Sequence, residues 1–363
     1  MEIENTRPKH FKILEANVIF LILAGAFLTL GAYVQSKEVL SGLLITEYGI
    51  ILLPILLYAA FTRKDIRQVF RLKKVPLKQS LKIMVIAALL LPTIAVVNLI
   101  AILIIELFSD AIILNIPTAE TGVQYIGLMF IISITAGLCE EFFFRGMILN
   151  AYEHELGMKW GAIFSGLLFA IFHFNPQNFF GPLVLGVMFS YLVQMSGSIF
   201  AGVIAHATNN GIAVSMGFLV NLFGNDVDAL AQNNTLFEST SALLLVIVFY
   251  GILAVGFAIL IKSVLRSLKK DYAAFDVGDR IEVREKNYEI VEKSESQFVI
   301  KEVDSDRLLT TDKARLVNAG IMNHYELWDK RKLKVGFVEM TPVIGALVAY
   351  GYIIYLAYIK GVG

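Results

Sequence analysis

Long runs of apolar residues, separated by polar segments, dominate the chain. A helix needs about 20 mostly apolar residues to cross the roughly 30 Å of hydrocarbon in a bilayer. The pattern predicts nine membrane helices, near 16–34, 42–61, 81–108, 124–149, 160–174, 181–195, 199–222, 243–265 and 336–359. The fifth and sixth runs are short, so we expect these helices to be tilted, re-entrant or shielded by their neighbours.

The segment 271–334 has a different pattern. It is rich in charged residues, and three stretches within it alternate between apolar and polar positions: 280–284, 288–291 and 297–301. Alternation with a period of two, bounded by polar turns, is typical of β-strands. We therefore predict an all-α polytopic membrane protein with an eight-helix core at 16–265. A small β-rich domain at 271–334 and a ninth, C-terminal span at 336–359 follow the core.

The composition agrees with a polytopic membrane protein. Hydrophobic residues make up 57% of the chain and charged residues 17%, whereas soluble domains contain about 25% charged residues. The 31 Lys and Arg balance the 31 Asp and Glu, so no net charge suggests nucleic-acid binding. Cys139 is the single cysteine, which excludes an intramolecular disulfide and a zinc site built from cysteines.

The positions of the basic residues predict the orientation in the membrane. With a cytoplasmic N-terminal segment at 1–15, all the Lys and Arg except Lys37 and Lys360 fall in inner segments. Inner loops are enriched in basic residues. We therefore expect the chain in the cell membrane with its N-terminus and the β-rich domain cytoplasmic and its C-terminus outside.

Charged residues inside the run at 124–149 are costly, by about 2.5–3.5 kcal/mol each near the bilayer centre. Glu141 and Arg145 are four residues apart with the acid first, an order that favours a helical ion pair. Glu140 projects about 100° away, so we expect it to be free to take a proton. Glu47, by contrast, is expected near the outer end of its helix, where water would solvate it.

Two further runs carry histidines and amides. Phe169 precedes His173 by four residues, and His206 precedes Asn210 by four, with Asn209 beside them. Singly, each feature has a structural explanation: an ion pair, a histidine bonded to a carbonyl, or asparagines joining membrane helices. Together they favour an intramembrane site. His173 lies deeper along its run than the other candidates, and the sequence leaves its position open.

These motifs resemble those of the CAAX prenyl endopeptidase and bacteriocin-processing family of intramembrane proteases. The family pattern is Glu-Glu-x-x-x-Arg, then Phe-x-x-x-His, then His-x-x-x-Asn. Here the motifs begin at Glu140, Phe169 and His206, on three of the predicted helices. The resemblance covers roughly 10–265, and the β-rich domain and the ninth helix lie outside it.

The resemblance implies an endopeptidase with the following roles. Glu140 and His173 would position and deprotonate a water, and His206 and Asn210 would donate hydrogen bonds to the tetrahedral oxyanion. Glu141 and Arg145 would fix the helix, and Arg145 could hold a substrate carboxylate. Phe169 and Asn209 would support the site.

The implied partners and cofactors follow from the same resemblance. The substrate would be a membrane-associated protein or peptide, which could be lipidated. Water activated by glutamate needs no cofactor, but His173, His206 and Glu140 could instead hold Zn²⁺, and the sequence does not decide. The basic segment 63–82 could lie on anionic lipid or simply anchor the topology.

Two other functional classes stay open. The same fold could serve as a non-catalytic membrane scaffold or regulator, or buried ionisable groups could relay protons in a transporter. The segment 271–334 could bind a protein partner, regulate the core or act as a spacer.

Overall fold

The structure is a computed structural model of the chain. It describes residues 10–106, 119–231, 240–272, 277, 280–283, 286–294, 297–303, 305–318 and 335–356.

Within the described residues, seven helices are long and apolar enough to cross a membrane. They are Ile13–Lys37, Val39–Phe61, Leu77–Ile105, Gly122–Leu156, Ile199–Phe223, Leu243–Tyr272 and Phe337–Ile354. The two runs predicted to be short form the shorter apolar helices α11 (Met158–Phe172) and α12 (Phe180–Ser196). The protein is therefore a mostly helical, multi-pass membrane protein.

Several spans are composite. The first joins α1 (Ile13–Ala26), the π-helical segment η1 (Phe27–Gly31) and α2 (Ala32–Lys37). The second joins α3 (Val39–Leu44), η2 (Ile45–Leu52) and α4 (Leu53–Phe61), and the third joins α6 (Leu77–Leu89) and α7 (Leu91–Glu106). The fourth joins α8 (Gly122–Leu128), η3 (Met129–Thr135), α9 (Ala136–Glu141), η4 (Phe142–Ile148) and α10 (Leu149–Leu156). The other helices are α5 (Ile66–Val69), α13 (Ile199–Ala231), α14 (Thr240–Tyr272), α15 (Lys313–Asn318) and α16 (Phe337–Ile354).

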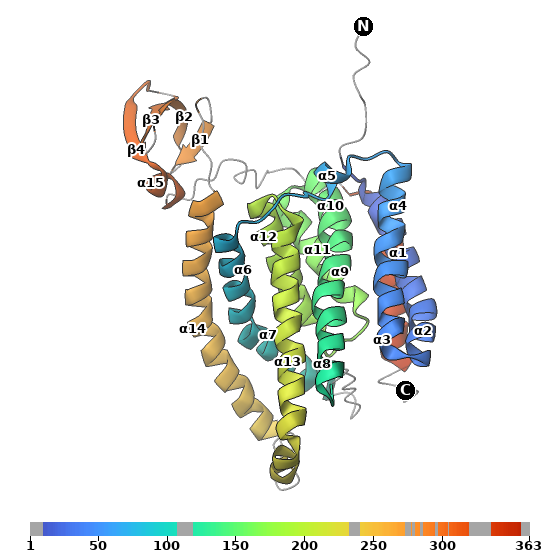
Figure 1. Cartoon of the computed structure of the whole chain (residues 1–363). Helices are drawn as coiled ribbons and strands as arrows, with labels where there is room; N and C mark the ends of the chain where they lie inside the picture. Colours follow the sequence, from blue (N-terminus) through green and yellow to red (C-terminus); the bar gives the residue numbers. More distant parts are fainter. Residues whose placement is uncertain are drawn as a thin grey trace.

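The fourth span and α13 lie at the centre of the bundle. Figure 1 shows α6, α7 and α14 on one side of α13, and α1 to α4 on the other. α13 packs against η3, α9, α12 and α6, while α11 packs against α10 and α12. α16 packs against α1, so the ninth predicted span lies beside the first.

A cluster of aromatic rings fills the space between α1, η4 and α11. Phe143 and Phe144 are fully buried, and the ring of Phe143 lies 6.1 Å from that of Phe20 and 5.7 Å from that of Phe172. Aromatic pairs at such separations add about 0.5–1.5 kcal/mol beyond the area they bury. The cluster thus fixes η4, the segment that follows the acidic pair, against the first span and α11.

α11 and α12 approach each other closely at a pair of glycines. A Cβ atom added to Gly186 would lie 2.6 Å from the Cα of Gly166. Only glycine permits so short a distance between the two backbones. The contact brings the backbone of α12 near the polar residues of the fourth span.

An antiparallel sheet follows α14 in the chain. Its strands are β1 (Arg280–Val283), β2 (Lys286–Lys293), β3 (Gln297–Glu302) and β4 (Leu308–Asp312), in the order β1-β2-β3-β4. The first three match the predicted strands, and β4 was not predicted. Ile290 pairs with Ile300, and both are buried beneath Leu316 of α15. In Figure 1 the sheet lies beyond the C-terminal end of α14.

Candidate active site

Glu141 and Arg145 form the predicted ion pair at the centre of the bundle. Arg145 Nη1 lies 2.7 Å from Glu141 Oε1, and both side chains are fully buried. Arg145 Nη2 donates to the carbonyl oxygen of Gly186 at 3.1 Å. Removing one partner of a buried ion pair strongly destabilises the fold, because the other charge is then left buried and unpaired. The burial favours a role for Arg145 in joining the fourth span to α12 over a role in binding a substrate carboxylate.

Two aromatic rings lie beside the guanidinium of Arg145. Its Cζ atom is 4.6 Å from the centre of the Phe169 ring and 5.4 Å from that of Phe189. A cation over an aromatic face is stabilised by about 2 kcal/mol or more where water is excluded. Phe169 of the second motif therefore contacts the arginine of the first.

Glu141 also orients His206. The Nδ1 atom of His206 lies 3.0 Å from Glu141 Oε1, so one carboxylate oxygen serves both the arginine and the histidine. Gly202, one turn before His206 on α13, leaves the space that the Glu141 carboxylate occupies, since a Cβ there would collide with Glu141 Oε2. With Nδ1 fixed, Nε2 of His206 faces Glu140, at 3.9 Å from its Oε2.

His173 caps the end of α11 and joins the same cluster. Its Nδ1 lies 2.8 Å from the carbonyl oxygen of Phe169, and a carbonyl can only accept, so Nδ1 carries the hydrogen. The Nε2 atom of the neutral ring is then an acceptor. The Phe169 ring meets both histidine rings edge-on, at 4.7 Å from His173 and 5.6 Å from His206. The structure thus brings His173, whose depth the sequence left open, close to the other motifs.

The two asparagines tie α13 to the fourth span. Asn210 Nδ2 donates to the carbonyl oxygen of Ile132 at 3.0 Å, and Asn209 Nδ2 donates to Asn210 Oδ1 at 3.3 Å. An amide nitrogen has two hydrogens, so Asn210 keeps a second donor.

Several buried polar atoms at the site lack a hydrogen-bond partner among the described residues. They include one oxygen each of Glu140, Glu141 and Asn209, and Nε of Arg145. Buried polar atoms are normally paired with protein or ordered water. The Glu140 side chain is 16% exposed, whereas that of Glu141 is fully buried. Glu140 is therefore the more exposed of the two acids, although its Oε2 atom is itself buried.

Glu47 was wrongly expected in water at the outer end of its helix. It lies in η2, which packs against α9, and it is only 5% exposed, with Oε2 unpartnered among the described residues. Glu140 and Cys139 are both close enough to interact with it electrostatically. Apolar flanking residues gave no sign that η2 would turn this carboxylate toward the bundle, although Thr46 and Glu47 form a polar pair within the run.

The fit of a metal can be judged from the ligand arrangement. Across the described residues, which include Glu140, His173 and His206, no three His, Cys, Asp or Glu side chains form a group that could hold a metal ion. These three residues therefore do not fit the zinc site considered from the sequence. Zinc stays a prediction that metal analysis would test.

The structure thus gathers a glutamate, two oriented histidines and two amides inside a membrane bundle. Residues 122–212 match the model of the type II CAAX prenyl endopeptidase Rce1-like family. The matched segment contains all three motifs, so this part of the chain is similar to the CAAX-type intramembrane proteases, as the motifs predicted. No curated protein and no solved structure matches the chain.

Proposed function

We propose that the protein is an endopeptidase that hydrolyses a peptide bond of a membrane-associated protein or peptide. The observation that carries this proposal is the position of Glu140. Its side chain is partly exposed, its buried and unpartnered Oε2 lies 3.9 Å from Nε2 of His206, and it lies near His173. A general base must reach the proton that it removes, and Glu140 is the acid of the motif that is not already paired.

The first step is attack by water on the scissile carbonyl carbon. Glu140 takes a proton from the water while Nε2 of His173 accepts its other hydrogen, and the new C–O bond gives a tetrahedral oxyanion. The C–N bond then breaks, and Glu140 returns the proton to the leaving amine. The glutamate therefore acts first as a base and then as an acid, and ends unchanged.

His206 and Asn210 stabilise the oxyanion. Nδ1 of His206 meets the Glu141 carboxylate, which fixes the ring with Nε2 on the side of Glu140; Nε2 donates to the oxyanion when it carries a hydrogen. Asn210 offers the N–H that is not used by Ile132. Losing one such donor typically slows the chemical step by about 10²–10³-fold. Arg145, through Glu141, holds His206 in place.

The test compares four strains: intact gene, deletion, Glu140→Gln, and Glu120→Gln as a matched control. Glu120 is an exposed acid outside the site. Membrane proteomes and released peptides are compared at native expression levels. We expect the same uncleaved precursor to accumulate in the deletion and Glu140→Gln strains and to be cleaved in the control. A Glu140→Gln strain that behaves like the intact gene would instead support a scaffold.

Zinc is tested separately, by metal analysis of the purified full-length protein. A stoichiometric metal that is lost together with activity on chelation would assign the water activation to the metal.

A further inference from the structure

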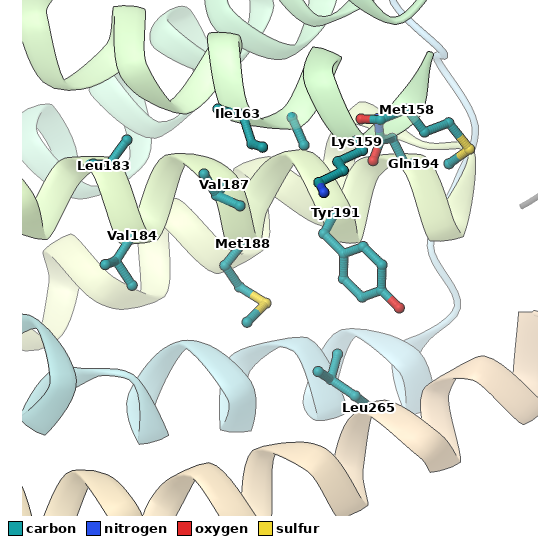
Figure 2. Close-up of a pocket in the computed structure, with 11 residues that line it drawn as sticks. Met158, Lys159, Ile163, Leu183, Val184, Val187, Met188, Tyr191, Gln194 and Leu265 are labelled. Carbon is teal, nitrogen blue, oxygen red and sulfur yellow. The ribbon is translucent and has the colours of Figure 1, made fainter. Parts of the chain in front are cut away.

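An elongated groove lies between α11, α12 and α14, away from the candidate active site. Its volume is about 590 Å³, and most of its lining is aliphatic, with Leu183, Val184, Val187 and Ile163 along its length. Figure 2 shows the polar groups of Lys159, Tyr191 and Gln194 gathered at one end, and Leu183 and Val184 toward the other. The groove is thus apolar along its length and polar at one end.

The length of the groove matches one leaflet of a bilayer. It follows α12 from Leu183 to Gln194, which at 1.5 Å per residue is roughly 16 Å. Half of the hydrocarbon thickness of a bilayer is about 15 Å. An acyl chain lying along α12 would therefore reach from the polar end to about the middle of the membrane.

Basic residues surround the polar end of the groove. An adjoining cavity of about 440 Å³ shares Met188, Tyr191 and Leu265 with it and adds three cations, Lys262, Arg266 and Lys269. Lys269 Nζ lies 5.6 Å from the centre of the Tyr191 ring. Among the described residues that line these two cavities, none is Asp or Glu. The polar end therefore offers positive charge to an anion.

A third cavity adds to this charge from the other side. It shares Met158 and Gln194 with the groove and is lined by Arg67, Arg71 and Lys73. Its one lining acid, Glu153, already contacts Arg71 at 2.9 Å and Gln194 at 3.2 Å.

We propose that the groove binds an anionic phospholipid. One acyl chain lies along α12, and the phosphate lies at the polar end beside Arg266 and Lys269. Basic residues near a membrane surface attract anionic headgroups by about 1 kcal/mol each. A peptide would fit poorly, because its backbone would need hydrogen-bond partners that the aliphatic lining does not supply. This site is independent of the proposed peptidase chemistry.

The test titrates the purified full-length protein in detergent with phosphatidylglycerol or phosphatidylcholine of the same acyl chains. Bound lipid is counted by native mass spectrometry. We expect one phosphatidylglycerol per chain to bind preferentially. The double variant Arg266→Gln/Lys269→Gln should lose about thirtyfold in affinity for phosphatidylglycerol, the effect of two basic residues, and none for phosphatidylcholine.

Two control variants separate this site from general surface effects. Lys74→Gln/Lys270→Gln removes the same charge from exposed residues that line none of the three cavities and should bind as the wild type does. Ile163→Trp fills the groove and should weaken binding of both lipids, whereas Ile252→Trp, at a 69% exposed position on α14, should not. Equal binding of both lipids to the wild type would overturn the proposal. So would a loss of affinity for phosphatidylglycerol in Lys74→Gln/Lys270→Gln that equals the loss in Arg266→Gln/Lys269→Gln.

Discussion

Glu141 connects the candidate active site to the rest of the bundle. Its Oε1 contacts Arg145 Nη1 at 2.7 Å and His206 Nδ1 at 3.0 Å, and Arg145 in turn reaches the backbone of Gly186. One carboxylate thus links the fourth span, α12 and α13. A residue that contacts no substrate in the proposed mechanism can therefore determine the position of those that do.

Replacing Arg145 should destabilise the fold. Arg145→Met leaves the buried Glu141 carboxylate without its cation, a change that costs about 3–5 kcal/mol. We expect a large fall in the thermal unfolding midpoint of the purified protein. Glu141→Gln/Arg145→Met should recover part of the loss, and Arg63→Met, at an exposed arginine that lines none of the three cavities, should have little effect. An unchanged midpoint for Arg145→Met would show that the pair does not stabilise the fold.

Replacing Glu47, unlike replacing Arg145, should stabilise the fold. Two carboxylates that lie near each other in an apolar setting repel when both are charged, and Glu47 lies buried near Glu140. Glu47→Gln keeps the shape and puts an amide that is never charged in place of a buried acid with an unpartnered oxygen, so we expect the free energy of unfolding to rise, and to rise more at higher pH. Thermal unfolding of Glu47→Gln against Glu120→Gln measures it. A lower midpoint would mean that the carboxyl group of Glu47 makes a stabilising contact.

These residues also show how far the sequence could predict the site. The spacing of Glu141 and Arg145 predicted their pair, because the geometry of one helix determines that contact. The contacts of Glu141 with His206 and of Arg145 with Gly186 could not be predicted, since they depend on how separate helices pack. Glu47 was misplaced for the same reason: its distance along a run gives its depth but not the direction in which its side chain points.

Among the apolar helices of the described residues, α11 and α12 are the two that are short for a membrane span. Their backbones meet at Gly166 and Gly186, and both help to enclose Arg145 and the proposed lipid groove. The apolar runs predicted both helices and their short length, because composition alone shows these properties. β4 escaped prediction, since Leu308–Asp312, two leucines followed by three polar residues, lacks regular alternation and the strand depends on pairing with β3.

Gly186→Ala should separate α11 from α12. The added Cβ would lie 2.6 Å from the Gly166 backbone, and such overpacking costs about 1–3 kcal/mol. We expect a lower thermal midpoint and a site that no longer holds Arg145 against α12. Gly256→Ala, in α14 with nothing within 4 Å of the added atom, is the matched control and should be neutral or slightly stabilising. Equal effects of the two substitutions would contradict the close approach.

The N-terminal end of α1 should be sensitive to acid. The ring of His10 stacks on that of His154 at 3.3 Å, and partial burial, then His154 and Lys64, lower the pKa of His10 below 6.5. The folded state thus favours the neutral ring, so its contribution to stability is full above about pH 6.5 and is lost as the pH falls below it. His10→Gln should reduce the fall in thermal midpoint between pH 7.5 and 5.5. An identical fall in both proteins would exclude His10 as the cause.

For the whole molecule, the distribution of basic residues predicts the orientation in the membrane. Cys139 is fully buried, so single cysteines introduced elsewhere can report on exposure. We expect a membrane-impermeant maleimide to label Ser41→Cys in intact cells, and Ser305→Cys only after the cells are opened. Both positions are exposed. Labelling in the reverse order would show that the orientation is the reverse of the predicted one. Substrate would then reach the site from the other side of the membrane.

The link from Arg145 to Gly186 has a consequence for biogenesis. The two residues are 41 positions apart, and Glu141 is 65 positions from His206. The ribosome therefore releases the acidic pair and its arginine well before their partners exist. The fourth span should wait in the translocon or beside a chaperone until α12 and α13 emerge, so a nascent chain truncated just after α10 should be recognised by membrane quality control.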